Sequence, residues 1–212
     1  MNSKLSCRRL VALMIVALAA GWADLAVGQA RGVTAQGRAA ILAAPATAFD
    51  GAKLGDQVVV EYLDFNCPYC KRQAISLKQL IAAEPRAKVL YKDWPIFGGV
   101  SAYAARAVLA AEWQGRYLAA HDALISAPSR LSSIDQVREA LKVAGVRLDR
   151  LDRDLKIHGA EIEAVLARNA NEARLLGFSG TPGLVVGTFV IPGAVPLETL
   201  QKALSLSAGT RQ

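Results

Sequence analysis

Hydrophobic and polar positions repeat with different periods along the chain, and the first segments predict a strand, a helix and a second strand. Residues 57–65 alternate and then run apolar through three consecutive valines, which is typical of a buried strand. Residues 68–83 carry apolar side chains at helical spacing, and Pro68 suits the first turn of that helix. Residues 87–94 return to a strand pattern.

A helical block follows from about residue 100 to residue 176, where no stretch alternates as a strand does. Apolar spacing and helix-start residues predict the helices of this block, at 101–113, 117–125, 133–143 and 160–176.

Two short apolar runs and a last helix close the pattern. Residues 184–186 and 188–191 meet at Gly187 as the arms of a hairpin do, and residues 197–206 predict the final helix. The first unit requires a parallel crossover and the last an antiparallel hairpin. The expected fold class is therefore α/β, with a mixed sheet covered by helices.

The first 28 residues have the three-part layout of a secretory signal peptide. Basic residues precede an apolar run at 10–20, and small residues follow before Gln29. The run is too short to span a bilayer comfortably, so a cleaved signal is favoured over a retained membrane anchor. Cys7 would be discarded with it, and export would bring the mature protein to the periplasm.

The rest of the chain predicts one domain between short flanking segments. Residues 29–48 are rich in Ala and Gly, with a short helix expected at 38–44, and form a linker or a small association segment. Residues 49–206 are long enough to bury one core without disulfides, and residues 207–212 form a tail.

The net charge of the chain excludes few classes of function. The formal net charge of the full chain is +7, and removal of the signal would leave +5 spread along the whole length. No dense basic run with interleaved aromatic residues is present, so nucleic acid is not an expected partner.

Two cysteines separated by two residues, Cys67 and Cys70, are the most informative chemical feature of the chain. They stand where the first strand gives way to the helix, so the first thiol is expected at the helix amino end. Unpaired backbone N–H groups and the helix dipole favour a thiolate there. The pair is therefore predicted to be a redox site.

Two other interpretations of the pair are weaker. A structural zinc site needs four ligands, and the mature chain would add only His121 and His158, which are far away and lack paired spacing. An inert disulfide across so small a loop would restrict the unfolded chain very little. We therefore expect no bound metal or organic cofactor.

The order of elements, the run Glu61-Tyr-Leu-Asp-Phe-Asn-Cys67-Pro-Tyr-Cys70-Lys and the late Gly180-Thr-Pro182 resemble the thioredoxin fold of the DsbA-like thiol:disulfide oxidoreductases. The resemblance covers about residues 49–206 and includes a helical insertion at about 100–176. It is strongest to the periplasmic branch that contains the suppressor-of-copper-sensitivity protein ScsC and the Com1-type outer-membrane proteins.

The resemblance implies that Thr181 and Pro182 join through a cis peptide bond that lies against the reactive cysteines. The alternative is an ordinary trans turn, since few X-Pro bonds in folded proteins are cis. A cis proline would present the Thr181 backbone to an extended substrate, which could pair along that edge as an added strand.

The resemblance also implies an acidic group beneath the active site, and Glu61 stands at that position. Its expected role is that of a candidate proton acceptor for Cys70, whose thiol must lose a proton to resolve a mixed disulfide. A solvated glutamate at a strand end is an equally weighted alternative. Asp64 is a third candidate, although alternation places it on the opposite face from Glu61.

Residues beside the cysteines are expected to tune them. Pro68 and Tyr69 form the dipeptide between the two thiols, and Lys71 and Arg72 add positive charge, which favours the thiolate of Cys67. The alternative for the two basic residues is a solvated helix face.

The hypothesis is thiol–disulfide exchange, with Cys67 as the exposed nucleophile and Cys70 as the shielded resolving thiol. Expected partners are secreted proteins with thiols or disulfides, and a membrane redox partner that resets the pair. Thr181 before the proline resembles isomerases and reductants more than strong oxidases, so isomerase or reductase activity is favoured over dithiol oxidase activity.

Rival functions come from other classes. Cys67 and Cys70 could hold Cu(I) in a copper-tolerance protein, because soft thiolates suit that ion. A surface antigen or adhesin with a vestigial motif is a further alternative. A homo-oligomer formed through residues 29–48 is an open expectation.

Overall fold

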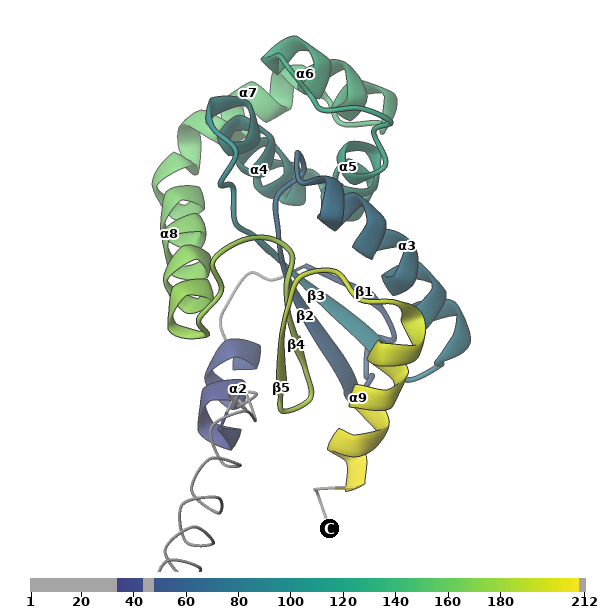
Figure 1. Ribbon diagram of the computed structural model, residues 1–212. Helices are drawn as coiled ribbons and strands as arrows, with labels where there is room; N and C mark the ends of the chain where they lie inside the picture. Colours follow the sequence, from purple (N-terminus) through teal and green to yellow (C-terminus); the bar gives the residue numbers. More distant parts are fainter. Residues whose placement is uncertain (1–33, 44–47, 210–212) are drawn as a thin grey trace, which may run out of the picture. The chain divides into compact units, whose positions relative to one another are not determined.

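The valine run forms strand β2, Gln57–Leu63, which lies at the centre of a five-stranded sheet in the computed structural model (Figure 1). The structure describes residues 34–43 and 48–209. The predicted signal peptide, residues 1–28, lies outside this described part, as do residues 210–212 of the tail. The sheet has the order β1-β3-β2-β4-β5, with β1 at Phe49–Gly51, β3 at Ala87–Asp93, β4 at Gly183–Val186 and β5 at Phe189–Pro192.

The pairing of the strands confirms the mixed α/β class predicted from the sequence. β2 runs parallel to β3, and helix α3, Pro68–Ala83, connects them. β4 is antiparallel to β2, and β5 is antiparallel to β4. β1, which the sequence did not predict, is a three-residue strand antiparallel to β3.

The hairpin turns at Gly187, as the sequence predicted. This residue has a φ of 60°, a conformation that residues with a Cβ seldom adopt. A Cβ there would also collide with the Ser207 side chain of the last helix, α9, Leu197–Gly209. The helix therefore extends three residues beyond the end expected from the apolar pattern.

Helices cover both faces of the sheet. Alternation along β2 sends Val59, Glu61 and Leu63 to one face, where α3 and α9 pack. It sends Val60 and Tyr62 to the other face, where α8, Gly159–Leu175, and the short helix α2, Ala35–Ala43, contribute buried residues. Burial on both faces explains the unbroken apolar run in the sequence.

A block of helices lies between β3 and β4 in the chain. It consists of α4 at Gly99–Ala111, a 3-10 turn η1 at Glu112–Gln114, α5 at Tyr117–Ile125, α6 at Ile134–Val143, α7 at Leu148–Ile157 and α8. Four of the α-helices match the predicted segments. Helix α7 was missed because six of its ten residues are charged, which masks the narrow apolar stripe that buries Leu151.

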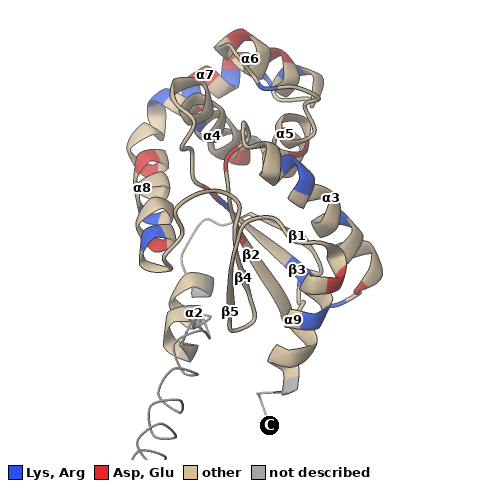
Figure 2. Ribbon diagram, viewed as in Figure 1, with Lys and Arg blue, Asp and Glu red and all other residues tan. Residues whose placement is uncertain are grey.

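Acidic and basic residues are interspersed over α6, α7 and α8 (Figure 2). Arg138 of α6, for example, donates two hydrogen bonds to the Asp152 carboxylate of α7, at 2.6 and 2.9 Å. Charged side chains therefore link neighbouring helices within the block.

One buried cation fastens this block to the sheet. Lys92 of β3 is fully buried, and its Nζ donates to Glu172 Oε2 of α8 at 2.8 Å. The Tyr62 hydroxyl of β2 donates to the same oxygen at 2.9 Å. A single carboxylate thus joins α8 to the two central strands.

We predict that Lys92→Ala lowers the free energy of unfolding by about 2 kcal/mol, because it leaves the Glu172 carboxylate without its charged partner at the sheet. Urea unfolding followed by circular dichroism measures the change. Lys88→Ala, on the same strand but partly exposed, is the matched control and should cost about 0.5 kcal/mol. Equal losses in the two variants would contradict the prediction.

Candidate active site

The local sequence places Cys67 as the N-terminal cap of α3, with extended backbone angles of −78° and 119° and with Pro68 in the first turn. Cys70 follows within that turn, and the Lys71 amide donates to the Cys67 carbonyl oxygen at 3.1 Å. Both cysteines are free thiols. Cys67 therefore lies at the positive end of the helix, where the sequence predicted it.

The sequence suggested that Cys67 is exposed, but the structure buries it. Its exposed fraction is 1% and that of Cys70 is 0%, whereas Tyr69 between them is 54% exposed. The reason is a second segment that covers the sulfur: the Cys67 thiol donates to the Thr181 carbonyl oxygen at 3.1 Å. Pro68 and Tyr69 are the part of the motif that solvent reaches.

The segment over Cys67 has the geometry that the resemblance implied. The peptide bond between Thr181 and Pro182 is cis, and the two residues directly precede β4. The Thr181 hydroxyl is buried beside Cys67, and a hydrogen bond from the Thr181 side chain contributes to lowering the pKa of Cys67. The structure thus brings Thr181 and Pro182 to Cys67 and Cys70, from which they are more than 100 residues away in sequence.

The two thiols differ in proton affinity rather than in exposure. A hydrogen bond from the Cys70 thiol is the main reason that the pKa of Cys67 falls to about 6, and the backbone amides of Tyr69 and Cys70 act in the same direction, against burial. Burial raises the pKa of Cys70 far above its usual value, with contributions from its hydrogen bond to Cys67 and from the Glu61 charge. Near neutral pH the pair holds one thiolate, on Cys67, and one thiol.

Glu61 is buried beneath the cysteines, so the alternative of a solvated strand-end glutamate is wrong. Its exposed fraction is 1%, and its Oε1 has no hydrogen-bond partner among the described residues. Burial raises the pKa of Glu61 to about 8, and the negative charges of Cys67 and Asp93 add to the rise. Glu61 is therefore largely protonated at neutral pH and responds to the charge state of Cys67.

Asp64 has a structural role that the sequence did not predict. One carboxylate oxygen accepts hydrogen bonds from the amides of Ile96 at 2.7 Å and Phe97 at 3.0 Å. The other accepts from the Asn66 amide at 2.7 Å and the Ser101 hydroxyl at 2.8 Å. Four donors occupy this carboxylate, so it organises the loops beside Cys67 and is a poor candidate for proton transfer.

Asn66, the residue before Cys67, binds the loop between α5 and α6. Its side-chain amide donates to the Leu131 carbonyl oxygen at 3.1 Å, and its side-chain oxygen accepts from the Leu131 amide at 2.8 Å. Sequence analysis missed this contact because nothing in a lone asparagine identifies a partner 65 residues away.

Lys71 is not a solvated helix residue. Its Nζ donates to the carbonyl oxygens of Leu124 at 3.1 Å and Ala127 at 2.9 Å, at the C-terminal end of α5. Burial lowers the pKa of Lys71. Arg72 instead lies over the exposed ring of Tyr69, 4.3 Å from its centroid. The two basic residues thus have different roles, and Lys71 links the active-site helix to the helical block.

Asp93 is a further buried carboxylate that sequence analysis missed. Its Oδ2 accepts a hydrogen bond from the Tyr117 hydroxyl of α5 at 3.0 Å. The sequence does contain a pattern that could have identified it. Alternation from Val89 through Tyr91 places Asp93 on the face of β3 that packs into the main core.

The described part of the chain offers few side chains that could together bind a metal ion. Across residues 34–43 and 48–209, no cluster of three or more His, Cys, Asp or Glu side chains is placed to hold a metal ion. Cys67 and Cys70 are the neighbouring soft ligands at the site.

Comparison with known proteins agrees with this geometry. Residues 58–205 match the model of the DsbA-like thioredoxin domain family. The structure is similar to a thioredoxin-like oxidoreductase from Silicibacter pomeroyi DSS-3, with a TM-score of 0.77 and 35% identity over 81% of this chain and 98% of that one. It is also similar to the catalytic domain of Proteus mirabilis ScsC, with a TM-score of 0.71 and 30% identity over 82% and 96% of the two chains.

A third similar structure is the thiol-disulfide exchange protein alpha-DsbA2 from Wolbachia pipientis. Its TM-score is 0.71, with 28% identity over 76% of this chain and 86% of that one.

The curated relatives are much longer proteins. One is the Na(+)/H(+) antiporter NhaA 3 from Salinispora tropica, 30% identical over 162 residues, which are 73% of this chain but 24% of the antiporter. The chain thus spans about a quarter of the length of that relative, and ion transport is not carried over to it. Among the described helices, none is both long and apolar enough to cross a membrane.

The family match over residues 58–205, the similar structures and the paired thiols under a cis proline lead to one identification. The chain belongs to the DsbA-like thioredoxin domain family and has the fold of its thiol–disulfide oxidoreductases, with structural similarity to ScsC.

Proposed function

We propose that the protein exchanges disulfides with secreted proteins through Cys67 and Cys70. The observation that carries the proposal is the pair of thiols at the start of α3 beside the cis Thr181-Pro182 bond. The pKa of Cys67 is lowered to about 6, whereas that of Cys70 is raised. A thiolate is the nucleophile in disulfide exchange, so Cys67 is ready to react at neutral pH while Cys70 stays protonated.

The exchange proceeds in two steps. The Cys67 thiolate attacks one sulfur of a substrate disulfide, the substrate S–S bond breaks, and the second substrate sulfur leaves as a thiolate. Cys70 then loses its proton and attacks Cys67, which breaks the mixed disulfide and releases the remaining substrate sulfur. The substrate is reduced and the protein is oxidised. If a substrate thiolate resolves the mixed disulfide instead, the result is isomerisation.

Glu61 is the candidate acceptor for the proton of Cys70. The charge of the Cys67 thiolate helps to keep Glu61 protonated. Formation of the mixed disulfide removes that charge, so the pKa of Glu61 falls when Cys70 must deprotonate. The carboxylate is thereby made available at the step that needs it.

Isomerase or reductase activity is the favoured direction. Thr181 precedes the cis proline. A threonine at this position resembles the isomerases and reductants of the related proteins more than the strong oxidases. The pKa of Cys67, about 6, is also closer to that of thioredoxin, about 7, than to that of the oxidase DsbA, about 3.5. A less stabilised thiolate makes the pair a weaker oxidant. Dithiol oxidase activity is the alternative.

Location and partners complete the proposal. Residues 1–28 would direct export to the periplasm, where disulfides persist. Secreted proteins with thiols or disulfides are the proposed substrates, and a membrane redox partner would reset the pair after each turnover. Residues 29–48 are the proposed segment for any homo-oligomer.

Mixed-disulfide trapping tests the proposal. Cys70→Ala, incubated with scrambled ribonuclease, should accumulate a covalent adduct through Cys67, because the resolving thiol is gone. Mass spectrometry after blocking of free thiols identifies the bond, and Cys67→Ala is the control that should form no adduct. Failure of Cys70→Ala to form any adduct would overturn the proposal.

The direction of the reaction has a separate test. We expect the unaltered protein to reactivate scrambled ribonuclease, and we expect its cysteine pair to be mostly reduced in cells. A mostly oxidised pair with rapid oxidation of reduced ribonuclease would establish the oxidase alternative. Retention of Cu(I) by Cys67 and Cys70 without ribonuclease reactivation would favour the copper-binding function.

The acidity of Cys67 leads to a pH prediction. Alkylation of the reduced protein by iodoacetamide should rise with pH to half its maximum rate near pH 6, since only the thiolate reacts. Cys70→Ala removes the principal hydrogen bond to the thiolate, so the midpoint should rise by about one to two pH units. Cys70→Ser keeps a donor in place and should cause a smaller rise. Unchanged midpoints would show that Cys70 does not stabilise the thiolate.

A further inference from the structure

A second buried carboxylate shares the layer beneath the thiols with Glu61. β2 and β3 are parallel, with Glu61 opposite Tyr91 and Leu63 opposite Asp93. Residues two apart on a strand share a face, so Glu61 and Asp93 project to the same side of adjacent strands, on a diagonal. Both side chains are buried, and each has one carboxylate oxygen without a hydrogen-bond partner among the described residues.

The helical block holds Asp93 from two directions. The Tyr117 hydroxyl of α5 donates to its Oδ2 at 3.0 Å. The Asn169 side-chain amide of α8 donates to its backbone carbonyl oxygen at 3.0 Å. Asp93 is therefore placed by residues that lie outside the strand, helix, strand unit carrying the cysteines.

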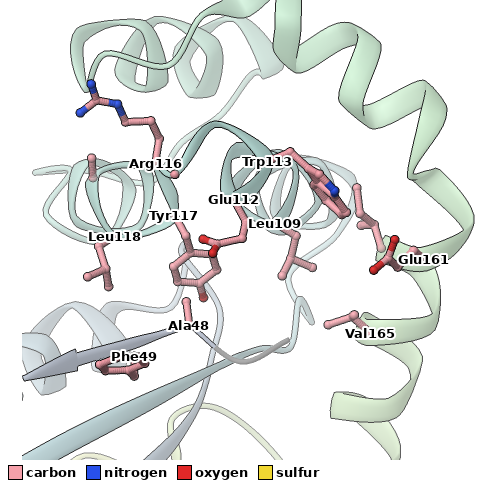
Figure 3. A pocket seen from close by; sticks show the side chains of 13 residues that line it. Ala48, Phe49, Leu109, Glu112, Trp113, Arg116, Tyr117, Leu118, Glu161 and Val165 are labelled. Carbon is pink, nitrogen blue, oxygen red and sulfur yellow. The ribbon is translucent and has the colours of Figure 1, made fainter. Parts of the chain in front are cut away.

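Tyr117 also borders a cavity of about 540 Å³ between the helical block and the start of β1. Figure 3 shows its ring among the lining side chains, beside Glu112 and above Ala48. The hydroxyl end of the same residue reaches Asp93. Tyr117 thus connects the wall of this cavity to the carboxylate pair.

The groups that act on the two carboxylates, which are Cys67 for Glu61 and Tyr117 and Asp64 for Asp93, are neutral or acidic. Lys92 on β3 points to the other face of the sheet, where it binds Glu172. The His121 ring of α5 lies 4.0 Å from that of Tyr91, and burial lowers the pKa of His121. The titratable groups that interact electrostatically with the pair are Cys67, Cys70, Asp64, Tyr91 and Tyr117, and the His121 ring stacks on Tyr117 with 6.2 Å between the ring centroids.

We propose that Asp93 and Tyr117 are positioning residues that control when Glu61 accepts the proton of Cys70. Charge on Asp93 opposes charge on Glu61, and the Tyr117 hydrogen bond decides how much charge Asp93 carries. The proposal rests on the proposed function, because the controlled step is the transfer of a proton from the Cys70 thiol to the Glu61 carboxylate.

The directions in which the pKa values of the two carboxylates shift agree with this placement. Burial raises the pKa of Asp93 to about 7, while the hydrogen bond from Tyr117 acts to lower it. The charge of Asp93 in turn raises the pKa of Glu61. Two buried carboxylates on one sheet face do not ionise independently, so the proton lost by Cys70 enters a coupled pair rather than a single residue.

The experiment is a carboxyl ¹³C NMR titration of Glu61 in the reduced, full-length mature protein, with Glu61→Gln to assign the signal. In the parent the midpoint is expected near pH 8. Asp93→Asn removes the opposing charge, so the Glu61 midpoint should fall by about one pH unit. Tyr117→Phe leaves Asp93 more protonated, so the midpoint should fall by a smaller amount.

The control is Asp154→Asn, which removes a buried carboxylate from α7, and it should leave the Glu61 midpoint where the parent has it. An unchanged midpoint in Asp93→Asn would overturn the proposal. If that variant does not fold, the near-isosteric Tyr117→Phe decides, and an unchanged midpoint there is equally decisive.

A kinetic measurement separates this inference from the proposed function. The pH at which Cys70 resolves a mixed disulfide with scrambled ribonuclease should fall in Asp93→Asn in parallel with the Glu61 midpoint. If the titration shifts but Cys70→Ala never captures ribonuclease, the carboxylate coupling stands and the exchange function fails. If exchange occurs and its pH profile ignores both substitutions, the positioning role fails alone.

Discussion

The hydrogen bond from the Cys70 thiol to Cys67 is the interaction on which the chemistry of the site depends. Both sulfurs are buried, and burial alone would raise the pKa of each. The bond lowers the pKa of one thiol and raises that of the other, which gives two neighbouring cysteines different tasks. Its geometry requires both residues in the first turn of α3, and therefore the strand end that positions that turn.

Side chains just before the cysteines keep that turn in place relative to the helical block. Asp64 binds the loop that contains Ile96 and Phe97, and Asn66 binds Leu131. Lys71, just after the motif, binds the end of α5. The active-site turn is thus held on both sides by polar contacts to segments far away in sequence, which is how a rigid scaffold preorganises a reactive group.

The elements that sequence analysis predicted are those with a strong period. β2, α3, β3 and the hairpin around Gly187 each bury a regular set of side chains, so their patterns were clear. β1 is too short to show alternation, and the apolar stripe of α7 is hidden among charges. The cysteines were found from their spacing, and Thr181 and Pro182 from the resemblance.

Burial at the site could not be predicted in the same way. Whether Cys67 is exposed depends on Thr181, a residue 114 positions away. Whether Glu61 has a second carboxylate beside it depends on strand register, and the partner of that carboxylate comes from α5. The sequence placed titratable residues on elements but did not determine which of them would meet.

The attachment of the helical block by two lysines affects how a substrate reaches the buried sulfur. Lys92 binds α8 on one face of the sheet, while Lys71, on the helix that covers the other face, binds α5. A rigid swing of the whole block would have to break both attachments. Uncovering Cys67 by displacement of the Thr181 segment leaves both intact. A displacement of the Thr181 segment, which touches the sulfur, therefore disturbs fewer polar contacts than a swing of the whole block.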